Sequence, residues 1–193
     1  RIQAGLLLRR YRHHQLRHHE PESSDPGGLR GPSQWLDSSY NALGPEQSTS
    51  DGLTSFNMSG VSYGADTSVA FINTSGVNYA PWMFGRAPGF FDEVCYTGTG
   101  SATTVTHNLG VAPEFIIVKG RSPAGLNWRT GCSYYNNSVS PWSYSCLLNS
   151  NAAVAGPSTT SWNGTAPTST VFSLGTSGDW NGSGSTYVAY LFA

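Results

Sequence analysis

The residues best suited to recognition chemistry form a cluster of aromatic side chains in the third quarter of the chain. Between positions 132 and 145, Tyr134, Tyr135, Trp142 and Tyr144 lie among asparagines and serines. Tyrosine and tryptophan offer rigid amphipathic area at a small entropic cost, so this mixture is typical of surfaces that bind a partner or stack on a sugar ring. The same composition suits a contact between subunits, or core aromatics in a long loop. These four are our candidate recognition or interface residues.

Carboxylates and histidines are the next candidates, because general acid–base chemistry depends on them. Asp92 and Glu93 are strand neighbours, so their side chains point to opposite faces and cannot act as a pair. Asp66 and Asp179 lie in glycine-rich turns, where bonding to the backbone explains them. His107 is predicted to hydrogen-bond the backbone in a turn. The sequence also has no nucleophile elbow, phosphate loop or dinucleotide fingerprint, so we predict no enzyme activity and no cofactor.

The histidine and cysteine patterns predict no metal site. His14 and His18 fall at the i,i+4 spacing of a helix, but they have no cysteine or carboxylate partners at ligand spacing. Cys95, Cys132 and Cys146 are an odd number of thiols without metal spacing. We expect buried free thiols in a reducing compartment, and a bond between Cys132 and Cys146 is the alternative.

The first 33 residues differ from the rest in charge and composition. Before Gly31, six arginines stand against three acidic residues, whereas four basic residues face eight acidic ones after it. Prolines and glycines from Pro21 onward oppose regular structure, so residues 1–33 are predicted to be an irregular basic N-terminal arm. The arm would dock on a partner protein. Its candidate docking residues are Arg9, Arg10, Arg12 and Arg17.

Two classes of partner are disfavoured by the whole sequence. The mildly acidic body after the arm argues against nucleic-acid binding, because phosphate contacts need a basic surface. No apolar stretch approaches the roughly 18 residues that a membrane-spanning helix requires. We therefore expect no nucleic-acid partner and no membrane span.

The candidate loop must be held by the elements around it, and these are predicted to be strands. Charged residues make up only 11% of the chain, so serine, threonine and asparagine must keep the surface polar, which favours turn-rich β structure. Between Phe90 and Lys119, three runs rich in Val, Ile, Thr, Tyr and Phe are separated by Gly, Asn and Pro, the pattern of an antiparallel meander. Residues 34–193 are predicted to form an all-β domain, an antiparallel β-sandwich or jelly-roll-like fold.

Two segments of this domain match each other. Residues 73–84 and 181–192 share Asn, Ser, Gly, Tyr and Phe at the same positions, and the likeness extends over 64–84 and 175–192. An internal repeat implies one structural unit used twice. We expect each copy to be a glycine-turned hairpin that ends in a strand with buried aromatic residues.

Four segments also carry a likeness to a known family. They are Arg86–Gly98, His107–Lys119, Trp162–Phe172 and Tyr187–Ala193. In this order they resemble the C-terminal β-rich domain of tail-fibre-like virion structural proteins of tailed bacteriophages, including phages of cyanobacteria and marine bacteria. The likeness runs from about Gly52 to the end of the chain.

The resemblance implies a β-rich, non-enzymatic module, often in an oligomer, with no catalytic residues. We therefore expect a bacteriophage virion structural protein, a tail fibre or tail-associated protein that contributes to assembly and host attachment. Its partners would be other virion proteins, further copies of itself with a trimer favoured, and a host surface glycan. It would be located in the virion and assembled in the host cytoplasm. The alternatives are a capsid decoration (cement) protein and a glycan-binding lectin module.

Overall fold

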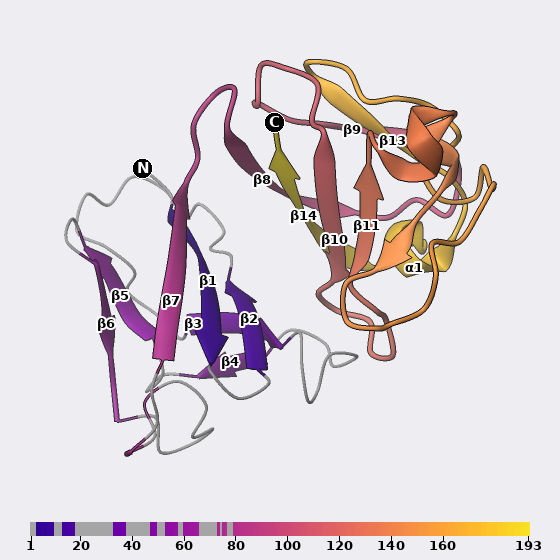
Figure 1. The fold of residues 1–193 in the computed structure, drawn as a ribbon. Coiled ribbons are helices and arrows are strands. Elements are labelled where there is room, and N and C mark those ends of the chain that lie inside the picture. The colour runs from indigo at the N-terminus through magenta and orange to yellow at the C-terminus, as the bar shows by residue number, and fades with distance from the viewer. Residues whose placement is uncertain are drawn as a thin grey trace. The chain divides into compact units, whose positions relative to one another are not determined.

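The structure is a computed structural model that describes residues 3–9, 13–17, 33–37, 47–49, 53–57, 60–65, 73, 75–76 and 79–193. These residues form antiparallel strands with a few short helical turns (Figure 1), which confirms the predicted all-β, sandwich-like fold. The chain divides into two compact units. The first lies within residues 1–40 and 46–85, and the second contains residues 86–193.

The first unit is built on an antiparallel sheet with the strand order β4-β3-β2-β1-β7. Strand β1 pairs with β7 along its whole length, from Gln3 opposite Gly85 to Arg9 opposite Tyr79. Strands β5 and β6 form a separate antiparallel pair. The bounds are β1 Gln3–Arg9, β2 His13–Arg17, β3 Ser33–Asp37, β4 Gln47–Thr49, β5 Leu53–Asn57, β6 Gly60–Tyr63 and β7 Tyr79–Gly85.

Two of these strands lie in the segment that composition predicted to be irregular. Strand β1 contains the apolar run Leu6-Leu7-Leu8, which faces Trp82, Pro81 and Ala80 of β7 in the register. A short apolar run suits an extended strand when a partner is available. That partner is far away in the sequence, so the composition of residues 1–33 did not indicate it. The glycine- and proline-rich stretch at 18–32 lies outside the described residues.

The second unit has two layers (Figure 1). One is a five-stranded antiparallel sheet in the order β12-β11-β10-β14-β8, and the other is the pair β9–β13. Strand β14 lies inside the sheet, with β10 on one side and β8 on the other. The bounds are β8 Phe91–Thr97, β9 Thr103–Thr106, β10 Phe115–Gly120, β11 Arg129–Cys132, β12 Cys146–Leu147, β13 Val171–Leu174, α1 Gly178–Asn181 and β14 Thr186–Phe192.

The core of this unit lies between the two layers. Alternate residues of a strand point to the same face, so β8, β10 and β14 send every second side chain toward β9 and β13. Three buried tryptophans from the connecting loops complete the packing. The buried core residues are Val105, Leu109, Ile116, Val118, Trp142, Trp162, Phe172, Leu174, Trp180, Tyr187, Ala189 and Leu191.

The predicted meander is wrong in its pairing, although its strands exist. Strands β8, β9 and β10 occupy the three β-type runs, but none of them pairs with another of the three. Strand β9 crosses to the second layer and pairs with β13, while β14 fills the place between β8 and β10. The buried face of β14 supplies the apolar contacts that a local hairpin would lack.

The predicted hairpin over 175–192 is also corrected. The strands before and after this stretch, β13 and β14, belong to different sheets and do not pair with each other. Between them lies the helical turn α1, which begins after Ser177. The hydroxyl of Ser177 accepts a hydrogen bond from the backbone N–H of Asp179 at 3.3 Å, as an N-cap residue does. The first copy of the repeat ends in strand β7, and most of residues 66–78 lie outside the described residues.

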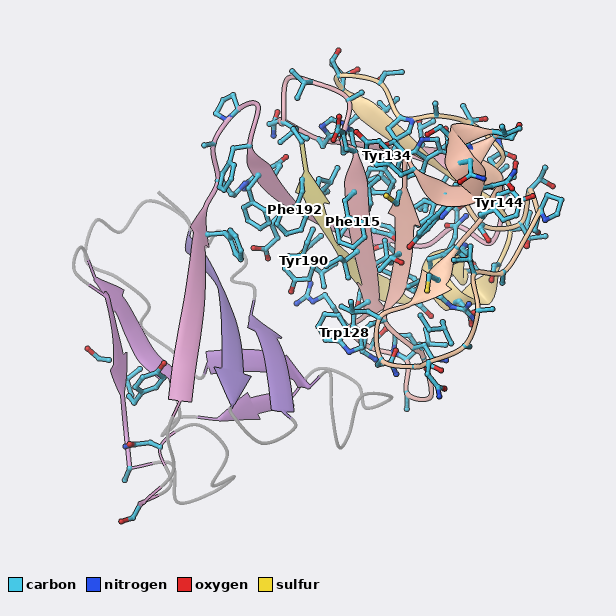
Figure 2. The ribbon with its side chains drawn as sticks, in the orientation of Figure 1. Phe115, Trp128, Tyr134, Tyr144, Tyr190 and Phe192 are labelled. Atoms are coloured by element: carbon cyan, nitrogen blue, oxygen red, sulfur yellow. The ribbon has the colours of Figure 1, made fainter. Side chains whose placement is uncertain are left out.

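The opposite face of the large sheet combines aromatic rings with two buried charged residues, Glu93 and Lys119. The rings of Phe91 and Phe192 lie 5.0 Å apart between centroids. Those of Phe115 and Phe192, which Figure 2 labels, lie 6.1 Å apart. Lys119 of β10 points to this face by strand alternation, and it is fully buried. Its Nζ donates to the backbone oxygen of Leu126 at 2.7 Å. Burial lowers the pKa of Lys119 from 10.5 to about 8, because a buried ammonium loses its hydration.

We expect this lysine to make stability rise with pH in an alkaline window. Between about pH 8 and 10 the unfolded chain keeps the Lys119 proton while the folded chain loses it, so the free energy of unfolding increases by up to about 2 kcal/mol. Above that window, burial and the charge of Tyr187 hold the pKa of Tyr96 well above 10, which opposes the gain. Urea unfolding at several pH values measures this, and Lys119→Met is the control. An identical slope in that variant would contradict the assignment.

Candidate recognition loop

The predicted aromatic cluster lies in the connection between β11 and β12, which we call the recognition loop (residues 132–145). The loop is closed at its base because Thr130 of β11 pairs with Cys146 of β12. Two short 3-10 turns, Tyr135–Ser138 and Pro141–Ser143, shape the chain between these strands. The loop is therefore anchored at an edge of the five-stranded sheet.

The backbone of the loop is held in an unusual conformation. Asn136, Asn137, Ser138 and Ser140 have φ values of 52°, 53°, 64° and 49°. Residues other than glycine rarely adopt this left-handed region, and asparagine is one of the residues that adopt it most often. The Asn136 side chain donates to the backbone oxygen of Val139 at 2.8 Å, and the Val139 N–H donates back to the Asn136 oxygen at 3.0 Å. Such strained positions persist only where the surroundings fix them, and they cluster at functional sites.

The four predicted aromatic residues do not form one surface. Tyr134 is 66% exposed, and Val139 on the same loop is 64% exposed. Trp142 is only 5% exposed, and its ring packs edge-on against Trp162 with 5.7 Å between centroids. Tyr144 is half-buried and packs against the backbone of Gly156, and Figure 2 labels it together with Tyr134. Trp142 thus belongs to the core, whereas Tyr134 is available to a partner.

Tyr135 is tied to the base of the loop. Its hydroxyl lies 2.5 Å from the hydroxyl of Thr130. Burial raises the pKa of Tyr135, the hydrogen bond to Thr130 lowers it, and the nearby Cys146 and Cys132 thiols add to the rise. Cys95, Cys132 and Cys146 are free, and each is half-buried. The prediction that these thiols are buried is therefore wrong.

The loop packs on a row of three aromatic rings, Trp142, Trp162 and Trp180, which we call the ring row. Trp142 contacts Trp162, which stacks on Trp180 at 5.3 Å, and the Arg129 guanidinium lies 5.3 Å over the Trp180 ring. The row fits against the sheet only because position 131 is glycine. A Cβ on Gly131 would lie 2.6 Å from Trp162 and 2.7 Å from Trp142, closer than packed atoms allow.

Sequence reasoning missed this row, although a signal for it is present. The triplet Trp-Asn-Gly occurs at 162–164 and again at 180–182. The two tryptophans of these triplets are the ones that stack. Asp179, which was predicted to act only in a turn, forms an ion pair with Arg129 beside the row.

The residues considered for catalysis have structural contacts. Asp92 is buried and accepts from the Arg86 side chain at 2.6 Å and from the Asn108 backbone N–H at 2.7 Å. The Leu109 N–H donates to Nδ1 of His107 at 3.2 Å, which confirms the predicted bond of this histidine to the backbone. Asp66 lies outside the described residues.

The predicted docking arginines fall partly on the first unit. Arg9 ends β1 opposite His13, and Arg17 ends β2 opposite Gly5. Arg10 and Arg12 lie outside the described residues, as does His18 of the histidine pairs. Among the described residues, no three histidine, cysteine or acidic side chains are grouped so as to hold a metal ion.

In the part of the chain that the structure describes, no helix is long and apolar enough to cross a membrane. Comparison with curated proteins found no match, and comparison with solved structures found none either. A family described as Domain of unknown function (DUF7483) matches residues 14–193, a span that includes the recognition loop and the whole two-layer unit. The chain therefore belongs to the DUF7483 family.

Proposed function

We propose that this chain is a bacteriophage virion structural protein, a tail fibre or tail-associated protein that uses the recognition loop for attachment. It has no enzymatic role in this proposal. Its partners are other virion proteins and further copies of the chain, with a trimer favoured, and it resides in the virion after assembly in the host cytoplasm. The family likeness of the β-rich segments supports the virion assignment, and the geometry of the loop supports attachment.

The observation that carries the attachment role is the exposure of Tyr134 and Val139 on a fixed backbone. Large apolar side chains exposed on a loop are suited to partner contact, and here the left-handed residues at 136–138 and 140 set the backbone in advance. A loop that is already ordered loses less entropy when it binds. Weak individual contacts then add by avidity when several copies act together.

The composition of the loop favours a neutral ligand. None of its 14 residues is charged, so it offers no ion-pair partner to an acidic or basic ligand. An exposed tyrosine ring beside asparagine and serine side chains is suited to stacking on a sugar and bonding its hydroxyls. This supports a host surface glycan as the ligand, and it keeps the lectin function as the second candidate.

We expect Tyr134→Ala to weaken binding to a panel of arrayed bacterial surface polysaccharides by about tenfold or more, because aromatic anchors dominate binding energies. Thermal unfolding should stay unchanged, since the ring is mostly exposed. Phe90→Ala is the matched control, because Phe90 is 52% exposed but lies outside the loop. Equal losses in both variants would contradict a role for the recognition loop.

The site of the chain in a particle separates the remaining candidates. Antibody labelling of phage particles purified from lysates in which the chain is produced, viewed by electron microscopy, should place it on the tail. Label over the capsid surface would favour the decoration protein. Unlabelled particles together with glycan binding by the free chain would favour the lectin and overturn the virion role.

A further inference from the structure

The two Trp-Asn-Gly triplets differ in exposure, because Asn163 of the first is exposed to solvent and Asn181 of the second is buried. Asn163 and Gly164 are exposed and have φ values of 55° and 60°. The Thr165 N–H donates to the Trp162 oxygen at 3.1 Å, so the triplet occupies a tight turn with positive φ at both central residues, as in type I′ turns. Within residues 86–193, the Asn163 side chain and the Gly164 N–H make no hydrogen bond.

We propose that Asn163 is a site of spontaneous deamidation, whereas Asn181 in the second triplet is protected. The backbone nitrogen of Gly164 attacks Cγ of Asn163, a Cγ–N bond forms and the Cγ–Nδ2 bond breaks. The Gly164 N–H proton leaves with the side-chain nitrogen as ammonia, and a cyclic succinimide remains. Water then opens the ring at either carbonyl and yields aspartate or isoaspartate. One water is consumed, one ammonia is released, and nothing is oxidised or reduced.

Glycine at 164 is what makes the attack possible. It has no Cβ to hinder the approach of its nitrogen to Cγ of Asn163, and rotation about ψ and χ1 of Asn163 brings the two atoms together. Because Asn163 is exposed and its amide is not held by a partner, its side chain can rotate into the attacking geometry. Exposed asparagines are among the thermolabile residues of proteins for this reason.

The second triplet has the same residues but lacks this freedom. Asn181 is fully buried, and its Nδ2 donates to the backbone oxygens of Ser101 and Gly175, each at 2.7 Å. The attacking group is also occupied, because the Gly182 N–H donates to the Tyr187 hydroxyl at 2.9 Å. Succinimide formation at Asn181 therefore requires the fold to open first.

The modification would change the packing of Trp162 and Trp142, two rings of the ring row. A Cβ built on Gly164 lies 3.4 Å from the Ser143 hydroxyl, so the turn lies close to the end of the loop. Isoaspartate adds a methylene to the main chain, which is incompatible with a turn of this size. We expect the packing around Trp162 to become less tight, and the contact between Trp162 and Trp142 to weaken with it. This consequence follows from packing and does not depend on the proposed function.

The test is incubation of the intact chain at mildly alkaline pH, followed by peptide mapping with mass spectrometry. Asn163 should convert at least about a hundredfold faster than Asn181, because opening of a folded core suppresses reactions of buried groups by that factor or more. In concentrated urea both triplets should convert at similar rates. Equal conversion in the folded chain, or an unmodified Asn163, would overturn the proposal.

A second measurement follows the rings themselves. Aged protein should show a changed tryptophan fluorescence spectrum in step with conversion at position 163, while Asn163→Gln, which cannot react at the same rate, should keep its spectrum over the same period. A spectrum that changes equally in the variant would refute the coupling between the turn and the ring row.

Discussion

Removal of residues 187–193 is expected to unfold the two-layer unit. Strand β14 lies between β10 and β8 and bonds to both, so its loss leaves β8 without a partner strand and exposes one edge of β10, which keeps only β11. Residues 187–191 are fully buried. Burial of each large apolar side chain contributes roughly 1.5–3 kcal/mol, and their sum is comparable to the whole stability of a domain, about 5–15 kcal/mol.

Circular dichroism and thermal melting measure this effect. The truncated chain should lack a cooperative transition for this unit, and it should be prone to aggregation because two strand edges are exposed. The control is removal of Ala193 alone, because this residue is exposed and contributes one backbone bond, to the Phe90 oxygen at 3.2 Å. A soluble product of the longer truncation with an unchanged melting temperature would refute the central place of β14.

The sequence predicted the strands of this unit better than their partners. The runs at 91–97, 103–106 and 115–120 are strands because β-branched and aromatic residues alternate there. Their pairing follows from which faces can be buried together, and that depends on residues at 171–174 and 186–192. A pattern read within a short window contains no information on such distant partners, so it favoured the local meander.

The same limit explains the outcome for the recognition loop. Its position was predictable, because aromatic and small polar residues concentrate at 132–145. Which of its rings faces solvent was not predictable. Trp142 is buried because it packs against Trp162 and because Gly131 has no side chain in its place. Neither neighbour lies within the loop. Composition therefore predicted where the candidate site lies, and the structure shows that Tyr134 is the exposed one of the four aromatic residues.

The repeat is a true sequence likeness, but the hairpin predicted for its second copy is wrong. Tyr187 shows why, because its hydroxyl donates to the Gly178 oxygen at 2.7 Å and accepts from the Gly182 N–H. These bonds hold the helical turn α1 under the ring, and the ring of Tyr96 stacks on it at 5.3 Å. The second copy thus contains a helical turn with Trp180 and Asn181 buried, so the chain does not fold back as a hairpin there.

Asn181→Ala is expected to destabilise the two-layer unit by about 3–5 kcal/mol, because each buried polar group left without a partner costs about 1–3 kcal/mol. The side chain joins three segments. Its Oδ1 accepts from the Thr99 N–H at 2.8 Å and from the Thr99 hydroxyl at 3.4 Å, and its Nδ2 donates to the oxygens of Ser101 and Gly175. Alanine removes all four bonds. A loss of this size should lower the melting temperature by roughly 10 °C or more.

Two further variants show that the hydrogen bonds cause this loss, and not the change of volume. Asn181→Asp keeps the acceptor for Thr99 but turns a carboxylate oxygen toward the oxygens of Ser101 and Gly175, so at neutral pH it should destabilise at least as much as alanine. Asn151→Ala is the matched surface control, because Asn151 is exposed, and its effect should stay within about 0.5 kcal/mol. If Asn181→Asp is as stable as the natural chain, the amide is not the connector between these segments, and the packing of Trp180 together with the Tyr187 hydroxyl bonds must hold α1 in place.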